Sequence, residues 1–456
     1  MADDTEGTDA DPASDAVRGS DYEYRPVPEG DVDEFRRHLT YAFRPTERYD
    51  PKEDPPPWGW MGDRRGIYDG GRLCCTGRHL RFDLRIRGEV HPVAGLSAVS
   101  TPPQYRRRGL VRRLLAESLA EYRDRELPFS ALWPFDHPFY RRFGWATVSK
   151  YATATCAPDA LACADRGALD GPEAGRYREL DGDDWRAMAA VYDAQDRPLS
   201  MDRDEEWWRK RVLAGYGDDP YAFGWDRAGR TDAGADEREG DGECGGESAD
   251  SGTDGDGDCD RELRGYVVYD VEEGDGGRRM DVAELCAVDH GARLALLRFC
   301  RYHDSQVDEV EFYGPPEASL QDLAADPRAV DVEIEPGAML RIVDVERALG
   351  ALAYPDVDRS VELAVADDLA AWNDGRFRLT VADGRGVCER VEGGTSRPDA
   401  RVGIGTLSAF AVGYYSVEEA RRYGDLSIES GAGGSPDALA ALFPRAEPRP
   451  FLREGF

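Results

Sequence analysis

The fold is decided by one stretch of the chain, Val93–Trp145, which reads VAGLSAVSTPPQYRRRGLVRRLLAESLAEYRDRELPFSALWPFDHPFYRRFGW. Its first eight residues predict a buried strand, because they are apolar or small and stand between Pro92 and Pro102. The small side chains allow another chain or a ligand to approach that strand closely. An arginine-rich loop follows, then a helical pattern, and PFSALWP after the helix predicts a second strand.

The segment after Gly109 has the apolar spacing of an amphipathic helix. Its buried face is predicted to comprise Val111, Leu114, Leu115, Ser118, Leu119 and Tyr122. Five of the eight residues from Arg106 to Arg113 are arginine. Backbone N–H groups and the helix dipole at a helix start favour negative charge, so strand, loop and helix together predict an anion site. The alternative is that the arginines lie over the helix surface and pair with neighbouring carboxylates.

The charge balance of the chain restricts its environment and partners. The 456 residues include 91 acidic and 58 basic side chains, a formal charge of −33, and lysine occurs only at positions 52, 150 and 210. This composition predicts a halophilic, cytoplasmic protein, because concentrated salt screens self-repulsion. It argues against nucleic acid as a partner, since phosphate binding needs a positive surface. An acidic N-terminus and the lack of an 18-residue apolar run predict no membrane partner and no secretory signal.

The cysteines and histidines do not form a recognisable site. The nine cysteines include no CxxC spacing, and the six histidines are scattered without HExxH or a Cys/His cluster. We therefore expect reduced thiols and no metal.

The length suggests about three domains, at roughly 150 residues each. The predicted organisation is a disordered acidic tail (1–19), a first domain (20–160), a second domain (161–332) and a third, α+β domain (333–456). Residues 227–262 are rich in Gly, Asp and Glu and have little to bury, so they predict an acidic surface loop inserted into the second domain.

The loop Arg106–Val111 has the pattern Arg-x-x-Gly-x-[Gly/Ala], with valine in the last small position. Between a strand and a helix, this pattern resembles the acetyl-CoA signature of the GNAT acetyltransferases. The later segment Pro138–Trp145 is similar to that family's late helix, which carries a tyrosine and ends in an aromatic–Gly–aromatic turn.

Further details resemble the Eis branch of the family, named for enhanced intracellular survival. They are the RRRGL loop, the Tyr140–Trp145 segment and the motif MLRIVDV at Met339–Val345. The resemblance implies two tandem GNAT-type α/β domains, each a mixed sheet flanked by helices, and a C-terminal sterol-carrier-like α+β domain. It also implies a homo-oligomer, commonly a hexamer. The corresponding region of the second domain, Val288–Arg293, lacks the arginine loop, so we expect no acetyl-CoA there.

The resemblance implies an acetyl-CoA-dependent N-acetyltransferase that transfers the acetyl group directly to a primary amine. The acceptor would be a small-molecule or peptidyl amine, aminoglycoside-like or lysine-type. The residues expected to bind the cosubstrate are Val99, Ser100, Arg106, Arg107, Arg108, Gly109, Leu110 and Val111.

Acyl transfer needs an acid for the departing thiolate and a base for the attacking amine. Tyr140 is the candidate acid, since a phenol is protonated at neutral pH; the alternative is a buried aromatic that only packs. By resemblance the base is the terminal carboxylate of Phe456, and the alternative is a frayed chain end. Trp58 and Trp60 after a Pro-rich run are candidates for an aromatic wall on the acceptor side.

A second hypothesis belongs to a different class of protein. In it, the chain binds a small molecule or lipid through the sterol-carrier-like domain, and the GNAT pair is not catalytic. The intact Arg106–Gly109 loop and Tyr140 favour the enzyme.

Overall fold

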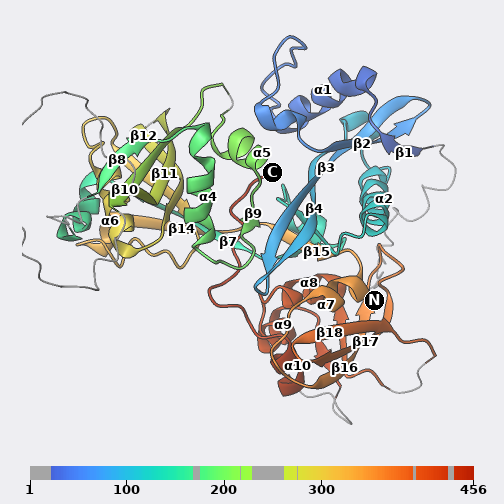
Figure 1. Ribbon diagram of the computed structural model, residues 1–456. Helices are drawn as coiled ribbons and strands as arrows, with labels where there is room; N and C mark the ends of the chain where they lie inside the picture. The colour runs from blue at the N-terminus through green and yellow to red at the C-terminus, as the bar shows by residue number, and fades with distance from the viewer. Residues whose placement is uncertain are drawn as a thin grey trace, which may run out of the picture.

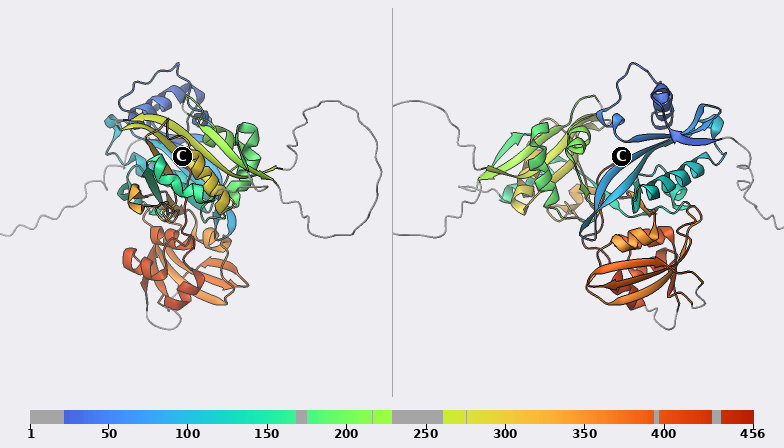
Figure 2. Two further views of the ribbon diagram at one scale, coloured as in Figure 1. Left: turned by 90° about the vertical axis from the view of Figure 1, so that its left-hand side faces the viewer. Right: turned by 45° about the vertical axis from the view of Figure 1, so that its right-hand side comes forward.

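The structure is a computed structural model that describes residues 22–167, 175–215, 217–228, 261–274, 276–393, 397–429 and 436–456. The predicted tail and residues 229–260 of the predicted acidic loop lie outside this range. The described residues form three lobes, each built around one sheet (Figure 1). The end of the chain leaves the third lobe and returns to a position between the other two (Figures 1 and 2).

The first lobe contains the segment that the sequence singled out. Its elements are β1 (Glu23–Pro26), α1 (Val32–Phe43), β2 (Asp63–Asp69), β3 (Arg72–Ile86), β4 (Glu89–Ser100), α2 (Leu110–Asp124), β5 (Phe129–Leu132), α3 (His137–Arg141), β6 (Ala146–Thr147), β9 (Met201–Asp202) and β15 (Met339–Ile342). The strand order is β1-β2-β3-β4-β5-β15-β6, with β9 paired to β3. Strands β3 and β4 form a long antiparallel hairpin, whereas β4 and β5 are parallel. Apart from Val111, which is half-buried, α2 buries the predicted face and also Leu110.

The second lobe has the strand order β14-β7-β13-β12-β11-β10-β8. Its elements are β7 (Lys150–Cys156), β8 (Arg176–Glu179), α4 (Trp185–Asp193), α5 (Glu205–Trp207), β10 (Tyr221–Ala228), β11 (Arg261–Gly274), β12 (Gly277–Ala287), α6 (His290–Arg301), β13 (Glu309–Gly314) and β14 (Val330–Pro336). The stretches RGYVVYDVEE and MDVAELCAV, with glycines between them, predict two strands and a turn. Strands β11 and β12 form this hairpin, with Gly274 opposite Gly277. The acidic loop connects β10 to β11, and these strands pair as far as Ala228 opposite Arg261.

The third lobe has the strand order β18-β17-β16-β19-β20. Its elements are α7 (Val345–Ala351), β16 (Arg359–Ala366), β17 (Gly375–Ala382), β18 (Arg385–Arg390), β19 (Ala400–Gly403), α8 (Ile404–Ala411), α9 (Val417–Tyr423), β20 (Ser427–Ile428) and α10 (Pro436–Leu442). The segments VELAVADD and FRLTVADG contribute to β16 and β17, which pair antiparallel. Strands and helices alternate irregularly here, as expected for an α+β unit.

Two strands belong to a sheet on the other side of a predicted domain boundary. Strand β7 precedes the predicted boundary at residue 160, yet it pairs with β13 and β14 in the second sheet. Strand β15 follows the predicted boundary at residue 333, yet it lies between β5 and β6 in the first sheet. One hydrophobic core also runs through all three lobes and includes Phe82, Tyr266 and Phe377. The lobes are therefore joined by shared sheets and packing as well as by linkers.

Arg341, in the MLRIVDV motif, joins the first lobe to the third. Its side chain is completely buried, and it donates to the Phe143 carbonyl and, over 2.5 Å, to Oδ2 of Asp367. The guanidinium also lies 5.2 Å from the centre of the Trp145 ring. The motif thus packs directly against the Phe143–Trp145 turn, although nearly 200 residues separate them.

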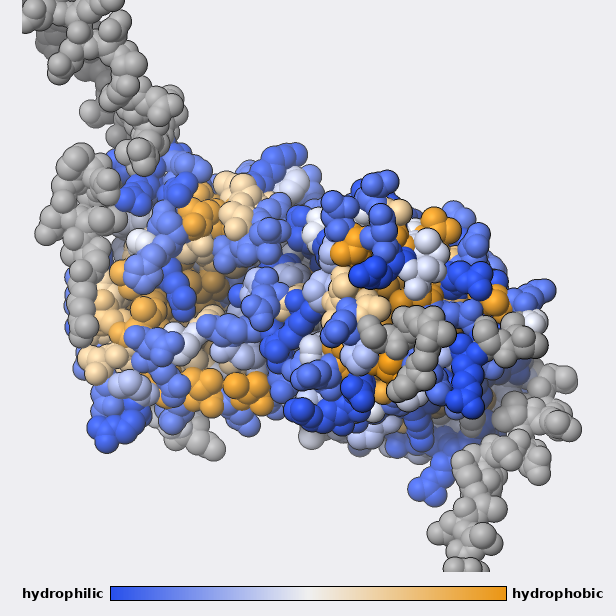
Figure 3. All heavy atoms as spheres, turned by 90° about the horizontal axis from the view of Figure 1, so that it is seen from below, coloured by the Kyte–Doolittle hydropathy of each residue, from blue (hydrophilic) through white to orange (hydrophobic). Residues whose placement is uncertain are grey.

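The surface agrees with the polar composition. Figure 3 shows one face of the molecule as mostly hydrophilic, with apolar side chains in separate patches. Within the described ranges, no helix is long and apolar enough to cross a bilayer. The same residues contain no group of three His, Cys, Asp or Glu side chains placed to hold a metal ion, and their cysteines are free and buried.

Replacing Gly144 by alanine tests the Arg341 junction. Gly144 has a φ of +86°, and an added Cβ would overlap the Arg341 guanidinium. Gly88→Ala is the matched control, because Gly88 has a φ of +81° and no heavy atom within 4 Å of the added carbon. We expect both changes to lower the free energy of unfolding by the ~1–2 kcal/mol of a left-handed alanine. Gly144→Ala should lose about 3 kcal/mol more, because it disrupts a buried ion pair. Denaturant unfolding at one salt concentration measures both, and equal losses would contradict this reading.

Candidate functional site

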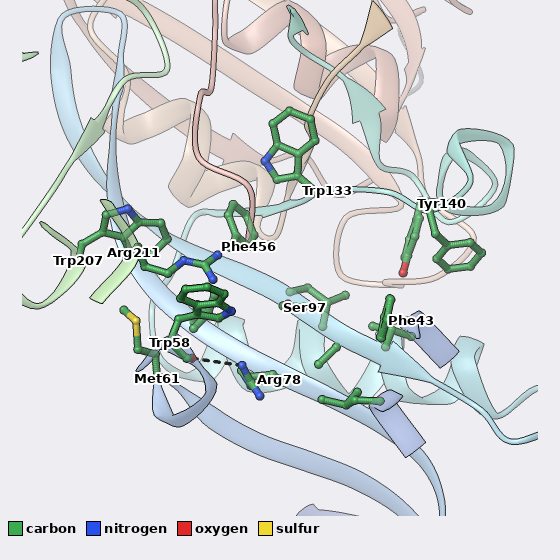
Figure 4. A pocket seen from close by; sticks show the side chains of 16 residues that line it. Phe43, Trp58, Met61, Arg78, Ser97, Trp133, Tyr140, Trp207, Arg211 and Phe456 are labelled. Carbon is green, nitrogen blue, oxygen red and sulfur yellow. Dashed lines mark hydrogen bonds between the residues drawn. The ribbon is translucent and has the colours of Figure 1, made fainter. Parts of the chain in front are cut away.

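A cavity of about 280 Å³ lies where β4 meets α3, the end of the chain and the second lobe (Figure 4). Its walls are mainly aromatic and aliphatic. The lining residues are Leu39, Phe43, Trp58, Met61, Arg78, Leu80, Leu96, Ser97, Ala98, Val99, Trp133, Phe135, Tyr140, Trp207, Arg211 and Phe456. Both predicted catalytic residues are therefore on the walls of one cavity.

The cavity forms because β4 and β5 separate. Their parallel pairing runs from Val93 opposite Phe129 to Gly95 opposite Ala131, and β4 continues beyond it to Ser100. A β-bulge with Ala98 at a φ of +55° bends this extension, as bulges beside active sites often do. Beyond Gly95, the edge of β4 that faced β5 has no strand partner in the described sheet. Its backbone groups are free to bind an extended ligand.

The two predicted strand-end residues differ in position. Val99 lines the cavity. The hydroxyl of Ser100 is buried and lies 2.7 Å from the hydroxyl of Thr76, so its side chain holds β4 to β3. Ligand binding by Ser100 would have to use its backbone.

The arginine loop leaves the start of α2 open. Arg107 and Gly109 have φ values of +58° and +73°, and Gly109 caps the helix without a side-chain acceptor. Arg106 donates to the Thr101 carbonyl and Arg108 to the Gln104 carbonyl, so both side chains brace the loop. Arg107 is exposed and makes no hydrogen bond or ion pair with any described residue. The free N–H groups and this free cation suit an anion.

In the second lobe, the N-terminus of the corresponding helix, α6, is capped by a side chain of the protein itself. Asp289 caps α6 by accepting the Ala292 N–H over 2.8 Å. Its carboxylate also accepts from Arg264 over 3.0 Å and lies 3.6 Å from Arg227. A carboxylate at this position repels a phosphate, which agrees with the expectation that no acetyl-CoA binds there.

Tyr140 is held rigidly at the cavity wall. Asp136 caps the N-terminus of helix α3, and its side chain accepts the Phe139 N–H over 3.1 Å. The Tyr140 ring packs edge-on against Phe139 and Trp145, with ring centres 5.1 and 6.3 Å away, and its hydroxyl points into the cavity (Figure 4). Burial, with a smaller effect of Cys75, raises the pKa of the phenol well above its ordinary value. The phenol thus stays protonated and can donate.

The chain ends inside the cavity wall. The Phe456 ring packs edge-on against Phe82, with ring centres 4.8 Å apart. This approach depends on Gly95, where an added Cβ would lie 3.2 Å from the Phe456 ring. The Trp133 indole donates to the Glu454 carbonyl and Arg211 donates to the Gly455 carbonyl. The last three residues are thereby held by both the first and second lobes.

A buried ion network fixes the chain at Glu454, two residues before Phe456. The Glu454 carboxylate accepts from the Tyr192 hydroxyl and from Arg203 Nε, each over 2.7 Å. The other nitrogens of Arg203 form a fork with Glu284, at 2.6 and 3.1 Å. All three charged side chains are more than 90% buried.

Of the predicted site residues, Val99, Tyr140 and Phe456 line the cavity, whereas Ser100 and the loop Arg106–Val111 do not; other lining residues were not suggested by the sequence. Trp58 lines the cavity, but Trp60 does not; it is 53% exposed and lies beside Arg64. The additions include Arg78, Trp133, Trp207 and Arg211. The adjacent tryptophans Trp207 and Trp208 predict a buried segment. The neighbouring sequence, however, does not indicate that Trp207 lines this cavity.

Comparison with known families agrees with the three lobes. Residues 23–148 match the family model of an acetyltransferase (GNAT) domain, and residues 256–342 match a second acetyltransferase (GNAT) domain. Residues 345–452 match a sterol carrier protein domain. The first match ends just before β7, the strand that joins the second sheet.

Two relatives extend over most of the chain. It is 27% identical over 408 residues to an uncharacterized N-acetyltransferase of Streptomyces griseus, which covers 86% of this chain and 89% of the relative. It is 29% identical over 337 residues to N-acetyltransferase Eis of Mycobacterium tuberculosis, covering 73% of this chain and 75% of that one.

Solved structures share the fold. A GCN5-related N-acetyltransferase from Anabaena variabilis superposes with a TM-score of 0.74 at 20% identity, covering 95% of this chain and all of that one. Eis1 from Mycobacterium abscessus gives a TM-score of 0.68 at 24% identity, with the same coverage. The predicted family and fold class are thus confirmed. The chain is an Eis-like member of the GNAT N-acetyltransferases, an acyltransferase with two GNAT domains and a C-terminal sterol carrier protein domain.

Proposed function

We propose that the protein transfers the acetyl group of acetyl-CoA directly to a primary amine in the cavity of the first lobe. The observation that carries this proposal is the meeting of Tyr140 and Phe456 on one cavity, at the end of β4 and next to the open start of α2. The N–H groups at the start of α2, the Tyr140 acid and the Phe456 carboxylate would then serve one continuous site on the first lobe.

The cosubstrate would lie along the separated strands. Its pyrophosphate fits the loop Arg106–Val111, where backbone N–H groups and the free Arg107 side chain offer positive charge. The pantetheine would follow the unpaired edge of β4 to Val99, which places the thioester carbonyl next to the cavity. No metal is needed in this scheme, since backbone donors polarise the carbonyl.

The acid and base complete the transfer. The amine nitrogen attacks the thioester carbonyl, and its proton moves to the terminal carboxylate of Phe456. As the carbon–sulfur bond breaks, Tyr140 donates its phenolic proton to the departing thiolate. The products are the acetylated amine and CoA with a free thiol, and the proton on the carboxylate returns to Tyr140 through solvent.

The ligand-binding alternative has less support. Three further cavities are lined by residues of the first two lobes and by Phe451, Arg453, Glu454 and Gly455. None of the described residues between 345 and 450 lines any of them. The halophilic and cytoplasmic setting and the homo-oligomer stay predictions from composition and from the family resemblance.

Replacing Arg107 by alanine tests the donor site. The side chain contacts no described residue, so its loss should leave folding unchanged. We expect KM for acetyl-CoA to rise by about tenfold with little change in kcat, because a phosphate contact is made equally in the ground and transition states. Initial rates of thiol release at the lowest salt that keeps the protein folded measure this. Arg421→Ala, on the exposed part of α9, should have no effect, and an unchanged KM for Arg107→Ala would remove the loop from the donor site.

Tyr140→Phe tests the acid. We expect kcat to fall by about 10²–10⁴-fold, as for other general acids, with acetyl-CoA binding retained. Tyr122→Phe is the matched control, because it removes a buried hydroxyl that has no hydrogen-bond partner. Since burial raises the pKa of Tyr140, the phenol stays protonated through the alkaline range, and kcat of the unmodified protein should not decline between pH 8 and 10. A full-rate Tyr140→Phe variant would exclude this role.

A C-terminal carboxamide tests the base. It removes the charge at Phe456 but keeps the ring that packs against Phe82. We expect acetyl-CoA to bind normally and kcat to fall by about 10²–10⁴-fold. A tag at the N-terminus, which lies outside the described residues, should leave kcat unchanged. Equal kcat for the carboxamide and the free acid would leave water or another carboxylate as the base.

A further inference from the structure

Two arginines stand among the aromatic walls of the cavity. Arg78 comes from β3 in the first lobe, and Arg211 comes from the short π-helix Trp208–Val212 in the second. Figure 4 shows them on either side of Trp58, with the Arg211 guanidinium near Phe456. Both side chains are half-buried and line the cavity.

Neither arginine has an anionic partner. No ion pair joins Arg78 or Arg211 to any residue that the structure describes, the terminal carboxylate of Phe456 included. Arg78 donates to the Trp58 carbonyl over a long 3.4 Å, and its buried Nε has no acceptor. Arg211 donates to the Gly455 carbonyl and otherwise lies over the rings of Trp58 and Trp207, 5.4 and 5.2 Å from their centres. Several N–H donors therefore remain unused.

The least exposed arginines of the described residues are placed differently. The buried arginines Arg203 and Arg341 are both matched to carboxylates. Acidic side chains outnumber basic ones overall, 91 to 58. Among the cavity's lining residues, however, there is no aspartate or glutamate. A partly desolvated guanidinium without an ion-pair partner is costly, so its persistence at a ligand cavity indicates a ligand that supplies one.

Burial affects both groups but does not neutralise them. It lowers the pKa of Arg78 to about 10, and the nearby Arg64 and Arg211 add to the effect. Burial likewise lowers the pKa of Arg211 to about 10, and the negative charge of Glu454, which is already paired with Arg203, opposes the effect in part. At neutral pH both guanidinium groups are still protonated, so they present two positive charges.

We propose that the acceptor carries an anionic group in addition to its amine, and that Arg78 and Arg211 bind that group. The proposal rests on the proposed function, since it concerns the acceptor side of the same cavity. A guanidinium presents a planar fork of N–H donors that matches carboxylate, phosphate or sulfonate oxygens. The aromatic walls exclude water and strengthen the contact. A polycationic acceptor of the aminoglycoside type would place like charges against Arg78 and Arg211.

Matched acceptors separate charge from size. The first probes are ω-amino acids of three to six carbons, each compared with its neutral carboxamide and with the diamine of equal length. Aminoalkyl phosphonates and sulfonates then identify the preferred anion. We expect kcat/KM for the best anionic amine to exceed that of its carboxamide by at least about tenfold, and the diamine to be poorer still. A preference for the diamine would overturn the proposal.

Charge variants locate the contact. Arg78→Gln and Arg211→Gln should each remove most of the preference for the anionic amine over its carboxamide, mainly through KM. Arg64→Gln removes a neighbouring positive charge from outside the cavity and should leave the preference intact. In Arg78→Glu the preference should move towards the diamine. If the glutamine variants keep the full preference, Arg78 and Arg211 do not bind the acceptor.

A binding measurement keeps this test separate from that of the proposed function. Stabilisation by acetyl-CoA, measured as a shift in Tm, reports the donor site alone and should be the same in all four variants. The N-acetylated form of the best anionic amine should stabilise the unmodified protein and not Arg78→Gln. If acetyl-CoA does not raise Tm, the result counts against the proposed function. If acetyl-CoA raises Tm normally but the matched acceptors have equal kcat/KM values, only the proposal of an anionic acceptor is overturned.

Discussion

The buried ion network of Arg203 is the constraint on which the candidate site depends. Arg203 lies between the carboxylates of Glu284, on β12, and Glu454, near the chain end, and all three are removed from solvent. Removing one member of such a network leaves an uncompensated buried charge, which costs about 3–5 kcal/mol. Chain ends normally fray. Here the network holds Glu454 at a fixed point, so that only Gly455 and Phe456 extend from it into the cavity.

The second lobe therefore has a positional role in the proposed reaction. It supplies Trp207 and Arg211, which line the cavity, and Glu284, which pairs with the Arg203 that holds the terminus. The proposed cosubstrate site lies wholly in the first lobe, along β4 and at the start of α2. Positioning groups to within a fraction of an ångström accounts for much of enzymatic rate enhancement. Under the proposed function, the second lobe, whose own helix start is capped by Asp289, is a rigid support for the first.

The sequence predicted the elements whose evidence is local. The strand before Pro102, the loop Arg106–Gly109, the amphipathic face of α2 and the β11–β12 hairpin all follow from spacing and turn residues over short distances. The sheets that β7 and β15 join and the acceptor wall were not predictable in this way. They depend on contacts between residues more than a hundred positions apart, such as Arg211 with Gly455, and no periodicity records such pairs. Phe456 entered through family resemblance, and its burial depends on Gly95 and Glu454, which carry no local signal.

The placement of β7 and β15 also shapes how the chain must acquire its fold during synthesis. Strand β5 emerges from the ribosome early, but its antiparallel neighbour β15 begins only at Met339. Until then β5 has an open edge, which is a template for pairing with the wrong chain. The sheet of the first lobe cannot be completed before the second lobe has been made, and its pairing of β5 with β15 is non-local and slow to form. Expression of residues 22–148 alone would yield a sheet with an unpartnered edge strand at β5.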